Sequence, residues 1–228
     1  MRRVIVCLLI WLGVTGCARP LSDNERAFLA GLHGPSFAQT STRLSGNLAV
    51  TPYLNSRKPR PRVTCVERVY PPVTEGRVWV APAAMAGFHT VWFRRDIYRK
   101  DFLAGWPDAM DLDRAMLFAH EMTHIWQWQE RARTGYSPLK GALEHVTSDD
   151  PYLFDPETQA EFLAFGYEQQ ASIVEEFVCC RALAPDAPRT HRLRAMLAQV
   201  MDVPPLGSAP RPQVQLPWAG ATRAGICD

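Results

Sequence analysis

Residues 120–124 read His-Glu-Met-Thr-His and lie in a stretch with the composition of a helix. Positions i and i+4 of an α-helix share one face, so His120 and His124 can direct two imidazoles at one point. Two such imidazoles are the first ligands that a tetrahedral zinc ion needs. Glu121 can reach a water held by that metal, which ionises near neutral pH. The motif therefore predicts two zinc ligands and a general base, Glu121.

The sequence around the motif is that of a buried helix. Between Asp113 and Arg133 there is no Pro or Gly, and most residues beside the motif are apolar. Asp111 or Asp113 can cap the start of this helix. Two histidines and a glutamate are costly to bury without partners, and a metal ion removes that cost. We therefore expect one Zn²⁺ per chain.

A catalytic zinc needs a third protein ligand and one open position. Glu144 lies 20 residues after His124, the spacing of thermolysin-like enzymes, but its surroundings at 141–151 are rich in turn formers. Glu168 lies 44 residues after His124, within 162–181, a second stretch of helical periodicity. A ligand should come from a rigid element, so we predict Glu168. The alternatives left open are Glu144, Glu175 and His145.

Two stretches carry a resemblance to a known family. Leu117–Gln129 (LFAHEMTHIWQWQ) and Phe165–Phe177 (FGYEQQASIVEEF) resemble small bacterial gluzincin-type (HExxH) metallopeptidase domains of the Vgr-related protein family. The resemblance extends to Leu21–Gly34 and Gly87–Tyr98, although this chain has HTVWFRRDIY where relatives often have another strand sequence. It implies that a glutamate of the second helix, here Glu168, completes the site with the motif residues.

The attacked carbonyl of a peptide develops negative charge on its oxygen, which hydrogen-bond donors stabilise. Three residues near the predicted ligands could supply such donors: His145, Tyr152 and Tyr167.

The first residues predict export. Arg2 and Arg3 precede an apolar run at 4–14 that is too short to cross a bilayer, and Val-Thr-Gly-Cys closes it at Cys17. We interpret residues 1–16 as a lipoprotein signal peptide and Cys17 as the lipidated first residue. The alternative is an ordinary signal peptide with an incidental cysteine. The residue after Cys17 is Ala18, not Asp. In this the chain resembles Gram-negative lipoproteins of the outer membrane, so we expect it to be anchored there and to face the periplasm.

Composition limits the partners. The formal charge is +2, and removal of residues 1–16 takes away two arginines and no acids, which leaves a neutral chain. Neutrality gives no electrostatic case for binding nucleic acid. The basic stretch at 57–62 (RKPRPR) is expected to be a solvated loop. The remaining chain fits one zincin-like domain, 17–202, followed by a Pro-rich extended tail, 203–228.

Exported chains can form disulfides, and four cysteines remain beside Cys17. A bridge between the adjacent Cys179 and Cys180 would be strained. We therefore expect Cys65 and Cys227 to pair separately with these two.

The fold class expected is α+β, with a small, mostly antiparallel sheet followed by zincin-like helices that carry the site. Ser22 and Glu25 form a capping box for a helix to about Leu32. Strands are expected at 46–52, 63–70, 77–81 and 89–98. Further helices are expected at 113–133, 162–181 and 189–201.

These features predict a zinc-dependent metallopeptidase that hydrolyses a peptide or protein substrate and is held at the cell envelope by a lipid anchor. The alternative is a catalytically silent, zinc-containing envelope lipoprotein that acts as a binding or assembly module. An inhibitor or assembly factor linked to a secretion apparatus is a further alternative, suggested by the family resemblance.

Overall fold

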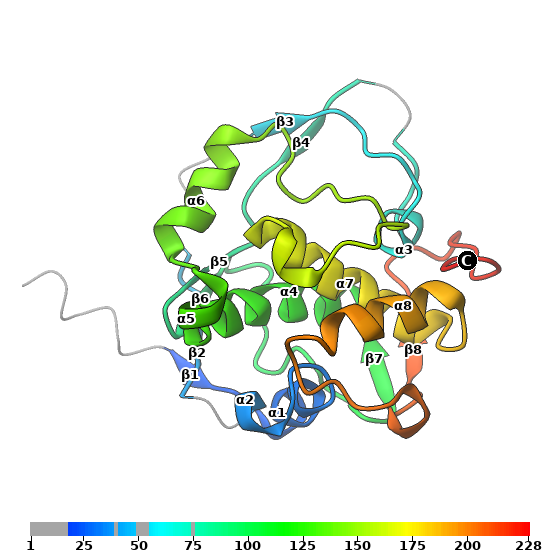
Figure 1. The fold of residues 1–228 in the computed structure, drawn as a ribbon, viewed down its shortest axis with the longest axis horizontal. Helices are drawn as coiled ribbons and strands as arrows, with labels where there is room; N and C mark the ends of the chain where they lie inside the picture. Colours follow the sequence, from blue (N-terminus) through cyan, green and yellow to red (C-terminus); the bar gives the residue numbers. More distant parts are fainter. Residues whose placement is uncertain (1–17, 39–40, 49–54, 74–75) are drawn as a thin grey trace, which may run out of the picture.

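The computed structural model describes residues 18–38, 41–48, 55–73 and 76–228 (Figure 1). The predicted signal peptide, 1–16, and the predicted lipidation site, Cys17, lie outside the described residues. Within the described ranges, no helix has both the length and the apolar character that a membrane span requires.

Seven of the eight described strands precede residue 112, and the run of helices α4–α8 follows, which confirms the α+β class. The helices are α1 (Asp23–Ala30), α2 (Pro35–Ala38), α3 (Cys65–Arg68), α4 (Leu112–Gln129), α5 (Arg131–Thr134), α6 (Pro138–Thr147), α7 (Tyr167–Leu183) and α8 (Pro188–Leu197), with 3-10 turns at Phe162–Ala164 and Leu206–Ser208. The strands are β1 (Arg19–Pro20), β2 (Arg43–Ser45), β3 (Asn55–Arg57), β4 (Val78–Val80), β5 (Ala84–Gly87), β6 (Thr90–Phe93), β7 (Ala109–Asp111) and β8 (Gln213–Gln215).

Helices α4 and α7 cross the middle of the molecule side by side and make its most extensive helix–helix contact (Figure 1). Phe118 and Ile125 of α4 and Phe177 of α7 are fully buried in the single apolar core. Burying one such side chain contributes about 1.5–3 kcal/mol. The two helices that carry the HExxH motif and Glu168 are therefore the most firmly packed elements of the fold.

The largest sheet of the described residues has the strand order β1-β2-β6-β5. Strands β1 and β2 pair antiparallel, as do β5 and β6, whereas β2 and β6 are parallel. The sheet is thus mostly antiparallel, as predicted. Strand β5 lies at its edge and also contacts α4. The sheet therefore meets the motif helix along an edge strand.

The cysteines pair as the sequence predicts. Cys65 is bonded to Cys179, and Cys180 to Cys227. The second bridge fixes the C-terminal tail to α7. Strand β8 of the tail also pairs in parallel with β7, directly before the motif helix. The tail is therefore extended but docked on the domain at two places.

The prediction of a strand at 63–70 is wrong, because Cys65–Arg68 form helix α3. Thr64 caps this helix by accepting from the Glu67 N–H. The buried carboxylate of Glu176 accepts from the N–H groups of Cys65 and Val66, at 2.9 and 3.1 Å. These caps satisfy the free N–H groups of a first helical turn. The decisive partner, Glu176, lies 111 residues away in the chain, beyond the reach of local alternation.

Further expectations are corrected. The first part of the stretch 141–151 is helical, because α6 covers Pro138–Thr147, with Ser137 as its N-cap and Pro138 in its first turn, where Pro is tolerated. The basic stretch at 57–62 is not a solvated loop, because Arg62 donates to the carbonyls of Glu67, Arg68 and Tyr70 at the end of α3. The strand expected at 46–52 is not seen at 46–48, and 49–54 lie outside the described residues.

Candidate metal centre

Caps fix the starts of the two helices that carry the candidate ligands. The Asp111 carboxylate accepts from the Arg114 N–H and caps α4. The Glu144 carboxylate of α6 accepts from the N–H groups of Tyr167 and Glu168, at 2.8 and 2.9 Å. Glu144, one of the alternative ligands, therefore caps α7 and anchors the backbone of Glu168.

His120, His124 and Glu168 converge inside the protein. The Nε2 atoms of the two histidines are 3.2 Å apart. Glu168 Oε2 lies 3.2 Å from His120 Nε2 and 3.3 Å from His124 Nε2. Each of the three residues is only 6% exposed. In the described part of the chain, these residues form the one group of histidine and carboxylate side chains that could hold a metal ion.

The triangle of donor atoms has the dimensions that a small divalent ion needs. With metal–ligand bonds of about 2.0–2.1 Å, tetrahedral geometry places neighbouring ligand atoms about 3.3–3.4 Å apart. The three observed separations between donor atoms, 3.2, 3.2 and 3.3 Å, are close to this expected distance. Two imidazole nitrogens and one carboxylate oxygen are also a donor set that zinc accepts. The side chains therefore fit the metal that the motif predicts.

The electrostatics of the metal-free cluster favour added positive charge. Burial alone would lower the pKa of His120 and His124, but the neighbouring carboxylates raise both. Burial alone would raise the pKa of Glu168, but the surrounding imidazoles hold it well below its usual range. The site thus attracts protons onto its histidines to balance buried carboxylates. A divalent cation would supply the same positive charge in place of those protons.

Gln127 fixes the tautomer of His124. Its Nε2 donates to the Tyr167 carbonyl and to Gln170 Oε1, both at 3.0 Å. Its Oε1 must then face His124 Nδ1, which lies 2.8 Å away and donates to it. With the proton fixed on Nδ1, a neutral His124 keeps the lone pair of Nε2 for a metal ion at the cluster. Metal-binding histidines are commonly oriented by such a hydrogen bond to their second nitrogen.

His120 and Glu168 have similar outer partners. Glu175 Oε2 lies 3.3 Å from His120 Nδ1, so this alternative ligand stands behind a histidine rather than in the triangle. The second oxygen of Glu168, Oε1, lies 2.9 Å from His145 Nε2. His145, a candidate ligand and transition-state stabiliser, thus contacts the outer oxygen of Glu168 and is not one of the three donors of the cluster.

Glu121 is buried beside the cluster and is only 6% exposed. Within the described residues, its carboxylate makes no hydrogen bond or ion pair. Burial raises its pKa, although the positive charges of His120 and His124 oppose the shift. A carboxylate without a fixed partner, next to the candidate ligands, is free to exchange a proton with a bound water or substrate.

Aromatic side chains flank the two histidines. The Tyr152 ring lies 5.7 Å from the ring of His120, and the Tyr136 ring is stacked 5.9 Å from that of His124. Burial raises the pKa of both phenols, so both are protonated donors at neutral pH. Tyr167, also a candidate stabiliser, contacts Tyr136 at 5.1 Å instead of a ligand ring. Among these tyrosines, Tyr152 and Tyr136 are therefore the ones whose rings contact the candidate ligands.

Sequence reasoning did not identify Gln127 or Tyr136 as parts of the site. Gln127 follows the motif by three residues and is fully buried. Its position one turn after His124 was the available signal, because i and i+3 are neighbours on a helix. Tyr136 lies in an irregular connection after α5, where no periodic pattern could place it.

We expect Gln127→Met to weaken zinc binding about 10–100-fold, the usual cost of losing an outer partner of a ligating histidine. Methionine keeps the bulk of the side chain but cannot accept from His124. Gln129→Met is the matched control, because Gln129 lies on the same helix and makes no hydrogen bond within the described residues. Competition with a chromophoric chelator measures both affinities. Equal zinc affinities in the two variants would contradict the role of Gln127.

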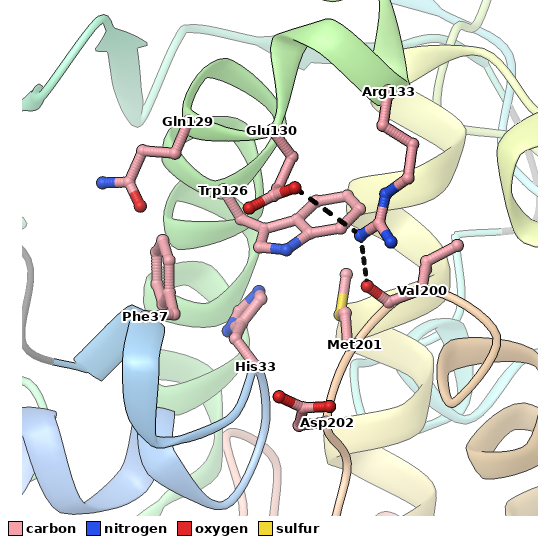
Figure 2. Close-up of a pocket in the computed structure, with 9 residues that line it drawn as sticks. All are labelled: His33, Phe37, Trp126, Gln129, Glu130, Arg133, Val200, Met201 and Asp202. Atoms are coloured by element: carbon pink, nitrogen blue, oxygen red, sulfur yellow. Dashed lines mark hydrogen bonds and ion pairs between the residues drawn. The ribbon is translucent and has the colours of Figure 1, made fainter.

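One cavity of the described residues lies away from this cluster. It has a volume of about 320 Å³ and lies between the end of α4, the segment after α1 and the segment after α8 (Figure 2). Trp126, His33 and Asp202 are among its walls, and none of the candidate ligands lines it. A second, water-sized cavity of about 30 Å³ is lined by Tyr152 and Glu175, which contact His120.

Three sulfur atoms also lie close together, those of Cys65, Cys180 and Cys227. All three belong to the two disulfides, so their sulfurs are not thiolate ligands. The candidate metal centre is therefore the histidine and glutamate cluster.

The fold has a counterpart among solved structures. The effector domain of Pseudomonas aeruginosa VgrG2b superposes with a TM-score of 0.50 and 22% sequence identity, over 86% of this chain and 93% of that domain. At this identity the likeness shows a shared fold. No family model matches the chain, and no curated protein matches it.

Proposed function

We propose that this chain is a zinc-dependent metallopeptidase. The observation that carries the proposal is the buried triangle of His120, His124 and Glu168, with edges of 3.2–3.3 Å and with Glu121 beside it. A bound zinc ion would activate a water molecule and polarise the carbonyl of a peptide bond. Two imidazoles, one carboxylate and a neighbouring base are the protein groups that this chemistry requires.

The residues of the chain have distinct roles in this proposal. Glu121 takes a proton from the attacking water and delivers it to the leaving amine. The phenol of Tyr152, with that of Tyr136 or the imidazole of His145, donates to the oxygen on which charge develops. Gln127 and Glu175 hold the two histidines in their ligating orientation. Strand β5, an edge strand among the described residues, could pair with an extended substrate.

The experiment that tests the proposal combines metal analysis and turnover. Purified protein is expected to hold about one zinc per chain and to cleave a mixed peptide library. Removal of the metal with a chelator should abolish cleavage, and added zinc should restore it. Cleavage that persists in the fully metal-free protein would contradict the proposal.

We also propose that the mature protein is lipid-anchored at Cys17 and faces the periplasm, an oxidising compartment in which its two disulfides can persist. Cys17→Ser should abolish incorporation of a labelled fatty acid and release the protein from the membrane fraction. Cys227→Ser, which removes a bonded cysteine instead, should retain the label. A wild-type chain that is exported without any label would refute the anchor.

A second candidate follows from the structural neighbour, whose name describes an effector domain. In this second proposal the chain has a secretion-related role in which it binds a partner. The metal centre then only shapes the binding groove and does not catalyse a reaction. The two candidates differ in turnover. A Glu121→Gln protein that retains full biological effect would favour binding, whereas loss of the effect would favour peptide hydrolysis.

A further inference from the structure

Arg60 belongs to the basic stretch at 57–62, yet its guanidinium is largely buried and binds acidic side chains of the protein. Its Nε and Nη2 donate to the two carboxylate oxygens of Asp150, at 2.6 and 2.7 Å. Its Nη1 donates to Glu67 of α3 at 3.2 Å. The Arg60 and Asp150 side chains are 19% and 16% exposed. A two-pronged pair of this kind holds its partners in a defined geometry as well as attracting them.

Asp150 and Tyr152 belong to one short turn. The Tyr152 N–H donates to Asp150 Oδ1 at 3.4 Å, and the Leu153 N–H donates to the Asp150 carbonyl at 3.3 Å. The Arg60 guanidinium also lies over the Tyr152 ring, 5.2 Å from its centroid. Arg60 therefore holds the turn through Asp150 and contacts the tyrosine directly.

The side of Tyr152 toward the site is lined by candidate catalytic groups. Its ring lies 5.7 Å from that of His120 and 5.5 Å from that of His145. Its hydroxyl makes no hydrogen bond within the described residues, so it is available to a substrate.

The turn does not pack tightly on every side. A cavity of about 30 Å³ adjoins it, lined by Tyr152, Leu153, Ser172 and Glu175 and also by Arg60. The hydroxyl of Ser172 is buried there and has no hydrogen-bond partner in the described chain. A turn above a partly polar cavity lacks the close-packed contacts that fix a core side chain. The contacts of Arg60 with Asp150 and with the ring of Tyr152 therefore help to hold the turn in place.

Arg60 is itself anchored to α7 through α3. Its partner Glu67 lies on α3, and α3 is bonded to α7 by the Cys65–Cys179 disulfide and capped by Glu176. The restraint thus runs from the rigid helix that carries Glu168 through α3 and Arg60 to the turn.

We propose that Arg60 is a positioning residue that holds the phenol of Tyr152 at the metal centre, where it donates to the oxygen of the attacked carbonyl. This inference rests on the proposed peptidase function. Holding a donor within a fraction of an ångström of its place matters, because a misplacement of about 1 Å can cost 100-fold in rate.

A double-mutant cycle tests the proposal. Tyr152→Phe should lower kcat about 100–1000-fold, and Arg60→Gln about 10–100-fold, with little change in KM or zinc content. In the Tyr152→Phe background, Arg60→Gln should have less than about a threefold further effect, because its target is already gone. Arg60→Lys, which keeps the charge but loses the two-pronged contact, should recover part of the activity. Equal effects of Arg60→Gln in both backgrounds would overturn the proposal.

A spectroscopic readout separates this inference from the proposed function. With 3-fluorotyrosine at position 152, Arg60→Gln should shift or broaden the fluorine resonance whether or not the protein cleaves peptides. The matched control is Arg94→Gln, which breaks a two-pronged pair with Asp96 at the surface and should leave the resonance unchanged. A changed resonance in a protein without peptidase activity would uphold the positioning role and reject the peptidase. An unchanged resonance in Arg60→Gln would overturn the positioning role.

Discussion

Glu121→Gln should lower the rate of peptide hydrolysis about 100–10,000-fold, the range expected for loss of a general acid–base group. Glutamine has the same shape, but its amide cannot take a proton from the attacking water. The carboxylate of Glu121 makes no hydrogen bond within the described residues, so the change breaks no existing contact. Steady-state kinetics on the zinc-loaded variant, with zinc content measured in the same sample, check this prediction.

The stability of Glu121→Gln should be unchanged or higher in the metal-free protein. Burial disfavours the charged carboxylate, as its raised pKa indicates, and a neutral amide avoids that cost. Glu130→Gln is the matched control, since Glu130 is an exposed acid at the end of the same helix. We expect it to leave both rate and stability unaltered. A Glu121→Gln protein as active as the wild type would remove Glu121 from the role of base.

The candidate ligands were predictable because their geometry is local or rests on a rigid element. His120 and His124 lie one turn apart, and helical periodicity alone places both on one face. Glu168 required a choice among several acids, and the preference for a residue on a helix selected it. The roles of the other acids, Glu144 and Glu175, could not be inferred from their position on a helix. Glu144 caps α7, and Glu175 stands behind His120, and both roles depend on how α6 and α7 pack.

The errors in the fold have a common physical origin. The stretch 63–70 alternates like a strand, but the carboxylate of Glu176 and the disulfide of Cys65 favour a helical turn there. Arg60 lies in a segment whose composition indicates a solvated loop, but its two-pronged contact with Asp150 draws it inward. In both cases the deciding partner is about 90 or more residues away in the chain. Local propensity is a weak guide where such a tertiary contact can form.

The same contrast separates the ligands from the groups that surround them. A metal ligand must be a histidine, a cysteine or an acid, so the sequence offers few candidates. An outer residue such as Gln127 needs only one suitably placed acceptor, and Tyr136 needs only a ring and a hydroxyl. Many residues of the chain meet those requirements. The structure shows which two lie beside His124: Gln127 accepts from its Nδ1 at 2.8 Å, and the ring of Tyr136 stacks on its imidazole.

Loss of a ligand should have a larger effect on zinc than loss of any outer partner. We expect His124→Ala to weaken zinc binding by more than about 100-fold, the upper end for outer residues, and to abolish hydrolysis at ordinary zinc concentrations. The reason is that two donors remain where the ion needs three protein ligands. Zinc content after dialysis is the direct measurement. His191→Ala, which removes an exposed histidine on α8, should retain one zinc per chain.

Unfolding experiments distinguish a lost ligand from a damaged fold. A ligand that binds only the native state stabilises it by RT ln(1 + [L]/Kd), so zinc at about 1000 times Kd should add about 4 kcal/mol to the wild type. The same zinc concentration should add little to His124→Ala, because its Kd is higher. Glu168→Gln gives an independent test, since its side chain keeps the shape of the ligand but loses the charge that attracts the cation. If both variants bind zinc as tightly as the wild type, the ion is held elsewhere, and the geometry of this cluster does not explain the activity.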